Sequence, residues 1–170
     1  MHAESKVEQT QKNFRALLDV CDQIDTLISI HYKDTGAFVK LSVRSPKDAP
    51  MYMSSFRHMI EDHISTSTLD VESPLCLSED ISIIRRCMWK ALQCRSAKDV
   101  ITILLRSERA YLDLLQHDLF LKGDKDKQFH MNIHLFPFFD KDGFDPDWEF
   151  RGFVVEGKRT CLTIYSPWVY

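Results

Sequence analysis

A lysine inside an apolar, strand-like segment is the first candidate for chemistry. Residues 37–43 read Ala-Phe-Val-Lys-Leu-Ser-Val, and their β-branched and aromatic side chains favour a strand. Lys40 shares one face of this strand with Phe38 and Ser42, because strand side chains repeat every second residue. With the polar run 45–48 that follows, this face can present cationic and hydroxyl groups to one anionic ligand. The alternative is an edge strand with a solvated lysine, which local chemistry alone slightly favours.

A second candidate lies near the end of the chain, in the run Glu149-Phe150-Arg151. On a strand, Glu149 and Arg151 share one face while Phe150 points to the other. An arginine so placed can bind phosphate oxygens, for which its planar guanidinium is well suited. A cross-strand ion pair explains the same pattern, and local sequence does not choose between the two.

Metal and phosphate-loop motifs are not supported. His130 and His134 share a strand face with Asn132, but no third ligand stands at a matching spacing, so we interpret them as strand histidines. In the acidic run 140–149, the glycine and the closing glutamate come two positions too early for a helix-loop-helix calcium site. The five glycines form no P-loop, dinucleotide fingerprint or Gly-x-Ser-x-Gly elbow.

The elements that position these residues follow from hydrophobic periodicity. The pattern predicts helices at 4–30, 51–62, 79–90 and about 97–115, the last with a candidate interruption at 107–109, and strands at 37–43, 129–136, 148–155 and 160–165. Ser78 is the expected cap of the third helix, and Ser96 with Asp99 forms a capping box for the fourth. Glu156-Gly157 is a tight hairpin signal between the last two strands. Residues 63–78 are rich in hydroxyls, and we expect a mobile loop there. Intermixed helices and strands without a repeat predict an α+β domain, with α/β as the alternative.

Composition limits the function classes. A chain of 170 residues fits one domain, so we treat 1–170 as a single domain. Its net charge of -3 indicates no bulk attraction to nucleic acid or to an anionic membrane. Five scattered cysteines without a Cys-x-x-Cys pair, a polar N-terminus and no long apolar stretch predict a cytoplasmic or nuclear protein.

Several short motifs, taken in order, resemble the cell division cycle protein 123 family. They are Phe-Val-Lys-Leu at 38–41, Ser-Pro-Lys-Asp-Ala at 45–49, Leu-Gln-Cys-Arg-Ser-Ala-Lys-Asp-Val at 92–100, Leu-Leu-Arg-Ser at 104–107, Asp-Leu at 113–114 and Glu-Phe-Arg-Gly-Phe-Val at 149–154. Each motif is short, but the ordered set is more specific than any one of them, and it spans most of residues 37–164.

The resemblance implies an ATP-grasp fold, with mixed and antiparallel sheets, packed helices and ATP between two lobes. By that analogy Lys40 and Arg151 contact phosphates, and Glu149 belongs to the same motif as Arg151. The expected ATP-binding set is completed by the turn beside Lys40 and by a strand whose backbone borders the adenine: Ser45, Lys47, Asp48, Ile133, His134 and Leu135.

The chain departs from the family pattern in three places. Phe-Pro-Phe stands at 136–138 where the family has a basic-x-Trp pattern, and Thr-Ile-Tyr-Ser at 163–166 replaces a Gln-Arg-Asp-Tyr run. The acidic and Asp-x-Asn residues that would hold Mg²⁺ are expected beyond Tyr170. We therefore expect this chain to be an N-terminal portion of the domain or a divergent member, with weak or no ATP binding and no turnover.

The resemblance further implies an assembly factor for eukaryotic translation initiation factor 2, acting through the γ subunit of that factor. Two alternatives stay open: an ATP-grasp ligase or kinase that modifies a protein or a small-molecule acceptor, and a protein-interaction module without nucleotide.

Overall fold

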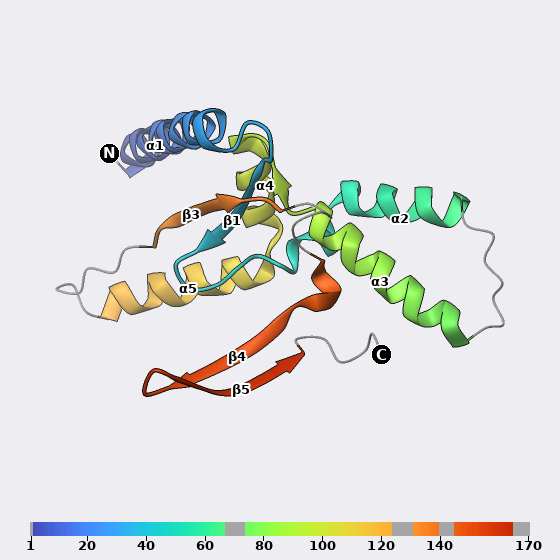
Figure 1. Ribbon diagram of the computed structural model, residues 1–170. Helices are drawn as coiled ribbons and strands as arrows, with labels where there is room; N and C mark the ends of the chain where they lie inside the picture. The colour runs from blue at the N-terminus through green and yellow to red at the C-terminus, as the bar shows by residue number, and fades with distance from the viewer. Residues whose placement is uncertain (1, 67–73, 124–130, 140–144, 165–170) are drawn as a thin grey trace.

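The computed structural model describes residues 2–66, 74–123, 131–139 and 145–164 (Figure 1). The elements in chain order are α1 (His2–His31), β1 (Ala37–Leu41), the 3-10 helix η1 (Ala49–Tyr52), α2 (Ser54–Thr66), α3 (Pro74–Lys90), β2 (Gln93–Cys94), α4 (Ala97–Arg106), α5 (Glu108–Gly123), β3 (Ile133–Pro137), the 3-10 helix η2 (Pro146–Trp148), β4 (Phe150–Val155) and β5 (Lys158–Ile164). Helices and antiparallel strands are mixed, so the α+β prediction is confirmed. None of the described helices is both long and apolar enough to cross a membrane.

A three-stranded antiparallel sheet in the order β2-β1-β3 organises the fold. The central strand β1 pairs Lys40 with His134 and Val39 with Leu135 of β3. Gly36, at φ +72°, lets the chain turn into β1, and a Cβ there would lie 2.9 Å from the Cγ of Gln93 and 3.1 Å from the Cys94 carbonyl oxygen. Glycine at this position therefore allows β2 to approach the start of β1.

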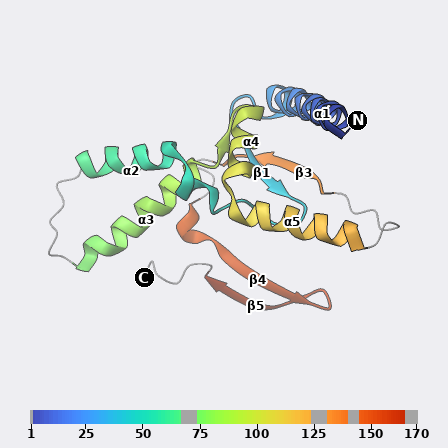
Figure 2. The same ribbon diagram turned by 180° about the vertical axis from the view of Figure 1, so that it is seen from behind.

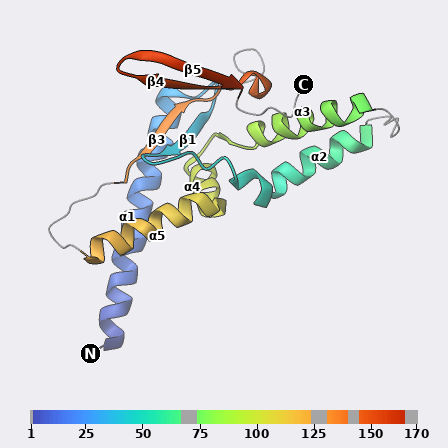
Figure 3. The ribbon, with the colours of Figure 1, turned by 90° about the horizontal axis from the view of Figure 1, so that it is seen from below.

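The core lies on one face of this sheet. Burial alternates along β1, with Ala37, Val39 and Leu41 buried and Phe38 and Lys40 half-buried. The buried face packs against apolar side chains of α1 and α4, namely Ile24, Ile28, Val100 and Ile103. Against the other face, Trp89 stacks between Phe38 and Phe138, with ring centroids 5.3 and 5.2 Å apart. In Figure 3 the sheet lies between α4 and the β4–β5 hairpin.

Two local predictions are confirmed at atomic detail. Ser96 Oγ accepts a hydrogen bond from the Asp99 amide and donates one to the Asp99 carboxylate, which completes the capping interaction at the start of α4. The hairpin between β4 and β5 turns at Glu156 and Gly157, both with positive φ, as a type I′ turn requires.

The predicted loop at 63–78 is too long. Helix α2 continues to Thr66 and α3 already begins at Pro74, while residues 67–73 lie outside the described part. The expected helix start at Ser78 is wrong for the same reason. Proline is well suited to a first helical turn, because its missing N–H would have no partner there, and this preference outweighs the capping signal of a serine four residues later.

Helices α2 and α3 lie side by side and form an arm to one side of the sheet (Figures 1 and 2). The arm is tied to the base of the hairpin: Arg85 of α3 donates to the carbonyl of Pro146, and Arg86 lies 3.6 Å from the Asp145 carboxylate. The hairpin itself is exposed along both strands in its described side chains, so its position depends on contacts at its base.

Candidate functional site

Lys40 lies at mid-strand on the sheet face that is not packed against α1 and α4. Residues directly opposite in an antiparallel pair share a face. Beyond Phe38, which is covered by Trp89, this defines an open face made of Lys40, Ser42, His134 and Phe136. The hydroxyl of Ser42 lies 3.5 Å from Nε2 of His134. Lys40 makes no ion pair or hydrogen bond through its ammonium group with the described residues. Its charge is thus available at the sheet surface.

A groove of about 570 Å³ runs between α1 and the outer edge of β3. Its walls are Val20, Gln23, Ile24, Leu27, His31 and Tyr32 from α1 and the turn after it, and Met131 to Phe136 from the segment that contains β3. This set includes Ile133, His134 and Leu135, the three residues expected to border an adenine ring. His134 joins the groove to the open face, because it lines the groove and lies opposite Lys40.

The floor of the groove is the outer edge of β3, which pairs with no other strand among the described residues. The Tyr32 hydroxyl donates a hydrogen bond to the Leu135 carbonyl at 2.9 Å, so this carbonyl points toward α1 and away from β1. Main-chain groups of alternate residues point to the same edge of a strand, so those of Ile133 face the groove as well. The edge therefore offers both N–H donors and carbonyl acceptors to a ligand.

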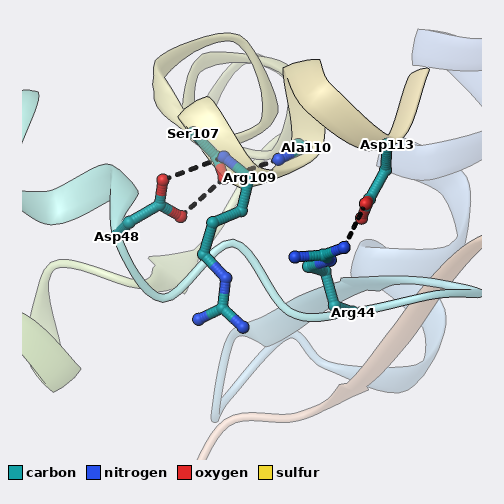
Figure 4. A network of polar contacts seen from close by, with 6 residues as sticks. All are labelled: Arg44, Asp48, Ser107, Arg109, Ala110 and Asp113. Carbon is teal, nitrogen blue, oxygen red and sulfur yellow. Dashed lines mark hydrogen bonds and ion pairs between the residues drawn. The ribbon is translucent and has the colours of Figure 1, made fainter. Parts of the chain in front are cut away.

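The loop after β1 is fastened to α5 at two points, which Figure 4 shows. Near one end, Arg44 Nη2 lies 2.6 Å from Oδ1 of Asp113, a side chain only 2% exposed. At the other end, the Asp48 carboxylate accepts hydrogen bonds from the Ser107 hydroxyl at 2.6 Å and from the Arg109 amide at 3.1 Å. Ser107 Oγ in turn accepts from the Ala110 amide and so caps α5. Asp48 therefore has a structural partner that its sequence neighbourhood does not reveal.

These contacts determine the electrostatics of Asp48. Burial alone would raise the pKa of its carboxyl group, but the hydrogen bonds from Ser107 and Arg109 and the nearby Arg109 charge outweigh burial and lower the pKa below its ordinary value. Asp48 thus stays ionised near neutral pH. The buried thiol of Cys94 behaves in the opposite way, since burial and the Asp99 charge raise its pKa to about 12, which makes it a poor nucleophile.

The remaining predicted residues form a second group beside the loop. Lys47 Nζ lies 2.5 Å from Oε1 of Glu149, and this ion pair joins the loop after β1 to the segment that enters β4. Ser45 is half-buried in the same loop. Arg151 is exposed on β4, opposite Thr163 of β5. The structure therefore brings together Lys40 with His134, and Lys47 with Glu149.

No group of three or more His, Cys, Asp or Glu among the described residues is arranged to hold a metal ion. His130 and residues 140–144 of the acidic run at 140–149 lie outside the described part. We assign no role to Mg²⁺ in the residues that the structure describes.

Sequence reasoning missed the contribution of α1 to the groove. Tyr32 follows Ile28 by four residues, so its position on the core-facing side could have been read from helical spacing. The partnership of Arg44 with Asp113 carried no such signal, because a loop arginine has many possible partners along a chain. Comparisons with protein-family models, with curated proteins and with solved structures find no match for this chain.

Proposed function

We propose that this chain binds ATP, with the adenine ring in the groove between α1 and β3 and the phosphates directed over His134 to Lys40. We further propose that it acts as an assembly factor of the kind that its motifs resemble, the cell division cycle protein 123 family, and that its fold is a form of the ATP-grasp fold. The observation that carries the nucleotide proposal is the groove, which is lined by all three residues expected to border adenine.

The chemistry of the groove supports a flat heteroaromatic ligand. Its volume lies within the range of small-molecule sites, about 300–1,000 Å³. Apolar side chains from α1 and β3 provide surfaces for a ring, and the β3 edge provides the donors and acceptors that an adenine edge requires. A ligand lying along this edge has its phosphate end near His134 and Lys40 on the open face.

The loop residues have a supporting role in this proposal. Asp48 is engaged with α5 and Lys47 with Glu149, so they fix the loop and the base of β4. Lys40 is then the residue on which phosphate binding depends most, and Arg151 of β4 is the second phosphate contact proposed from the motif.

Replacing Lys40 with alanine is expected to weaken ATP binding. Losing one charge-assisted hydrogen bond costs about 1.5–3 kcal/mol, which corresponds to about a 10–150-fold rise in Kd. Because we expect weak binding, the measurement is an NMR titration of the full chain with ATP, followed through the amide signals of Ile133 and Leu135. Lys98→Ala, an exposed lysine of α4, is the matched control and keeps the affinity of the unchanged chain.

An adenosine titration separates the two parts of the proposed site. Adenosine lacks phosphates, so its shifts at Ile133 and Leu135 are expected to be equal in the unchanged chain and in Lys40→Ala. If ATP shifted neither amide, or if Lys40→Ala bound ATP as well as the control, the nucleotide proposal would be wrong.

The assembly role is tested separately with the purified γ subunit of translation initiation factor 2. We expect the immobilised γ subunit to capture the chain in biolayer interferometry, with the same affinity for Lys40→Ala when nucleotide is left out. The support for this partner is the ordered set of motifs from residue 38 to residue 154. Absence of capture would leave a nucleotide-binding protein with a different partner.

A further inference from the structure

The N-terminal half of α1 exposes an apolar stripe. Val7, Phe14 and Leu18 are 57%, 59% and 47% exposed, and Leu17 is 43% exposed. Their spacing places them on one side of the helix, in phase with Ile24 and Ile28, which are buried in the core. The stripe that packs the second half of α1 therefore continues, without cover from the described residues, along the first half.

The helix is long enough for the two halves to have separate roles. Thirty residues at about 1.5 Å per residue span about 45 Å. The second half packs on the core, and Asp25 accepts a hydrogen bond from the Ala97 amide at the start of α4. In Figure 3 the first half extends past α5 and away from the sheet.

Charged residues beside the apolar stripe can form ion pairs with the same segment of a second copy of the chain. Glu8 and Arg15 are two turns apart on the same flank, and with Gln11, Lys12, Ala16 and Asp19 they line a shallow hollow of about 380 Å³. When two such helices run antiparallel about a two-fold axis between residues 11 and 12, the same flanks face each other. Each Arg15 then meets Glu8 of the second copy, whereas in a parallel two-fold pair this flank faces the opposite flank of the second helix, so Arg15 and Glu8 do not meet.

We propose that the exposed half of α1 binds the same half of α1 in a second copy of this chain, antiparallel and two-fold symmetric, through residues 7–18. The apolar stripe forms the centre of this interface and the two Arg15–Glu8 pairs form its rim. This arrangement covers the stripe and fixes the direction of the second helix.

Sedimentation equilibrium of the full chain over a range of concentrations tests the proposal. We expect a monomer–dimer equilibrium in the unchanged chain. Phe14→Glu is expected to raise the dimer Kd at least about 100-fold, because it puts two like charges at the centre of the interface. Since Phe14 is exposed, circular dichroism and Tm, measured at a concentration at which the unchanged chain is monomeric, are expected to match those of the unchanged chain, which excludes misfolding as the cause.

Charge reversal tests the direction of pairing. Arg15→Glu is expected to raise the dimer Kd about tenfold at low salt, because each ion pair becomes a repulsive pair. The double variant Glu8→Arg/Arg15→Glu restores opposite charges across the two-fold axis and is expected to restore the Kd. Arg106→Glu, exposed at the end of α4, is the control for net charge and leaves the Kd unchanged.

Three outcomes overturn the proposal. A chain that stays monomeric at every concentration has no such interface. A dimer that survives Phe14→Glu uses a different surface. A double variant that stays as weak as Arg15→Glu shows that the helices do not pair antiparallel in this register.

Discussion

Replacing Asp48 with alanine is expected to lower the free energy of unfolding by about 2–4 kcal/mol, since hydrogen bonds to a charged group contribute about 1.5–3 kcal/mol each and are not additive. The change removes the acceptor for both the Ser107 hydroxyl and the Arg109 amide. Ser107 is only 1% exposed, so its hydroxyl loses its partner in a place that water reaches poorly. Urea unfolding followed by circular dichroism measures the loss.

The controls for Asp48→Ala separate the hydrogen bonds from the charge. Asp48→Asn keeps a carbonyl oxygen for one donor and removes the charge, so we expect it to lose about half as much stability. A double-mutant cycle with Ser107→Ala isolates the contact between the two side chains. Equal stability of Asp48→Ala and the unchanged chain would show that the loop is held to α5 by other contacts.

The contribution of Asp48 to the stability of the fold decreases as the pH falls. The pKa of Asp48 is lower in the folded chain than its ordinary value of 3.8. Its stabilising contribution is therefore complete above the ordinary value and is lost as the pH falls through the folded-state pKa. The stability difference between the unchanged chain and Asp48→Ala should narrow as the pH falls below about 4.

Replacing Arg44 with methionine is expected to lower the free energy of unfolding by about 2–4 kcal/mol. This is less than the loss of about 3–5 kcal/mol that is typical when one partner of a fully buried ion pair is removed. The smaller value reflects the Arg44 side chain, which is 40% exposed to water, whereas Asp113 is 2% exposed. Neither Asp113 oxygen accepts a hydrogen bond of good geometry within the described residues, so the Arg44 charge is its main compensation. Without it, a carboxylate is left buried beside α5.

The matched variant for Arg44→Met removes the other partner. Asp113→Leu leaves an arginine whose side chain can turn toward water, so we expect it to lower the free energy of unfolding by less than about 1.5 kcal/mol. We expect the double variant Arg44→Met/Asp113→Leu to be as stable as Asp113→Leu alone. Thermal unfolding of the three variants makes the comparison. If Arg44→Met and Asp113→Leu were equally destabilising, the difference in exposure between Arg44 and Asp113 would not determine the effect of losing either partner.

Local signals predicted the helices and the hairpin better than the contacts between them. Ser96 with Asp99 and Glu156 with Gly157 interact with close sequence neighbours, so residue type and spacing were sufficient. Asp48 illustrates the opposite case: its neighbours suggested a ligand-binding turn, and its partners lie at the start of α5.

The elements that form the groove were predicted from the sequence, but their contact with each other was not. The strand that forms its floor was expected from β-branched and aromatic residues, and the helix that forms its wall from apolar periodicity. Strand β3 and helix α1 lie together because both contact β1. Strand β1 pairs with β3 along one edge, and its buried face packs against α1. Sequence periodicity gives the faces of elements and leaves their partners undetermined.

The position of β1 at the centre of the sheet has a consequence for synthesis on the ribosome. Both of its neighbours, β2 and β3, are encoded later in the chain, and β3 comes only after α5. Until those segments leave the exit tunnel, β1 exposes two unpaired edges and an apolar face, the features that make nascent chains prone to aggregate. The N-terminal part therefore cannot complete its core as it emerges, and folding is delayed until most of the chain has been translated.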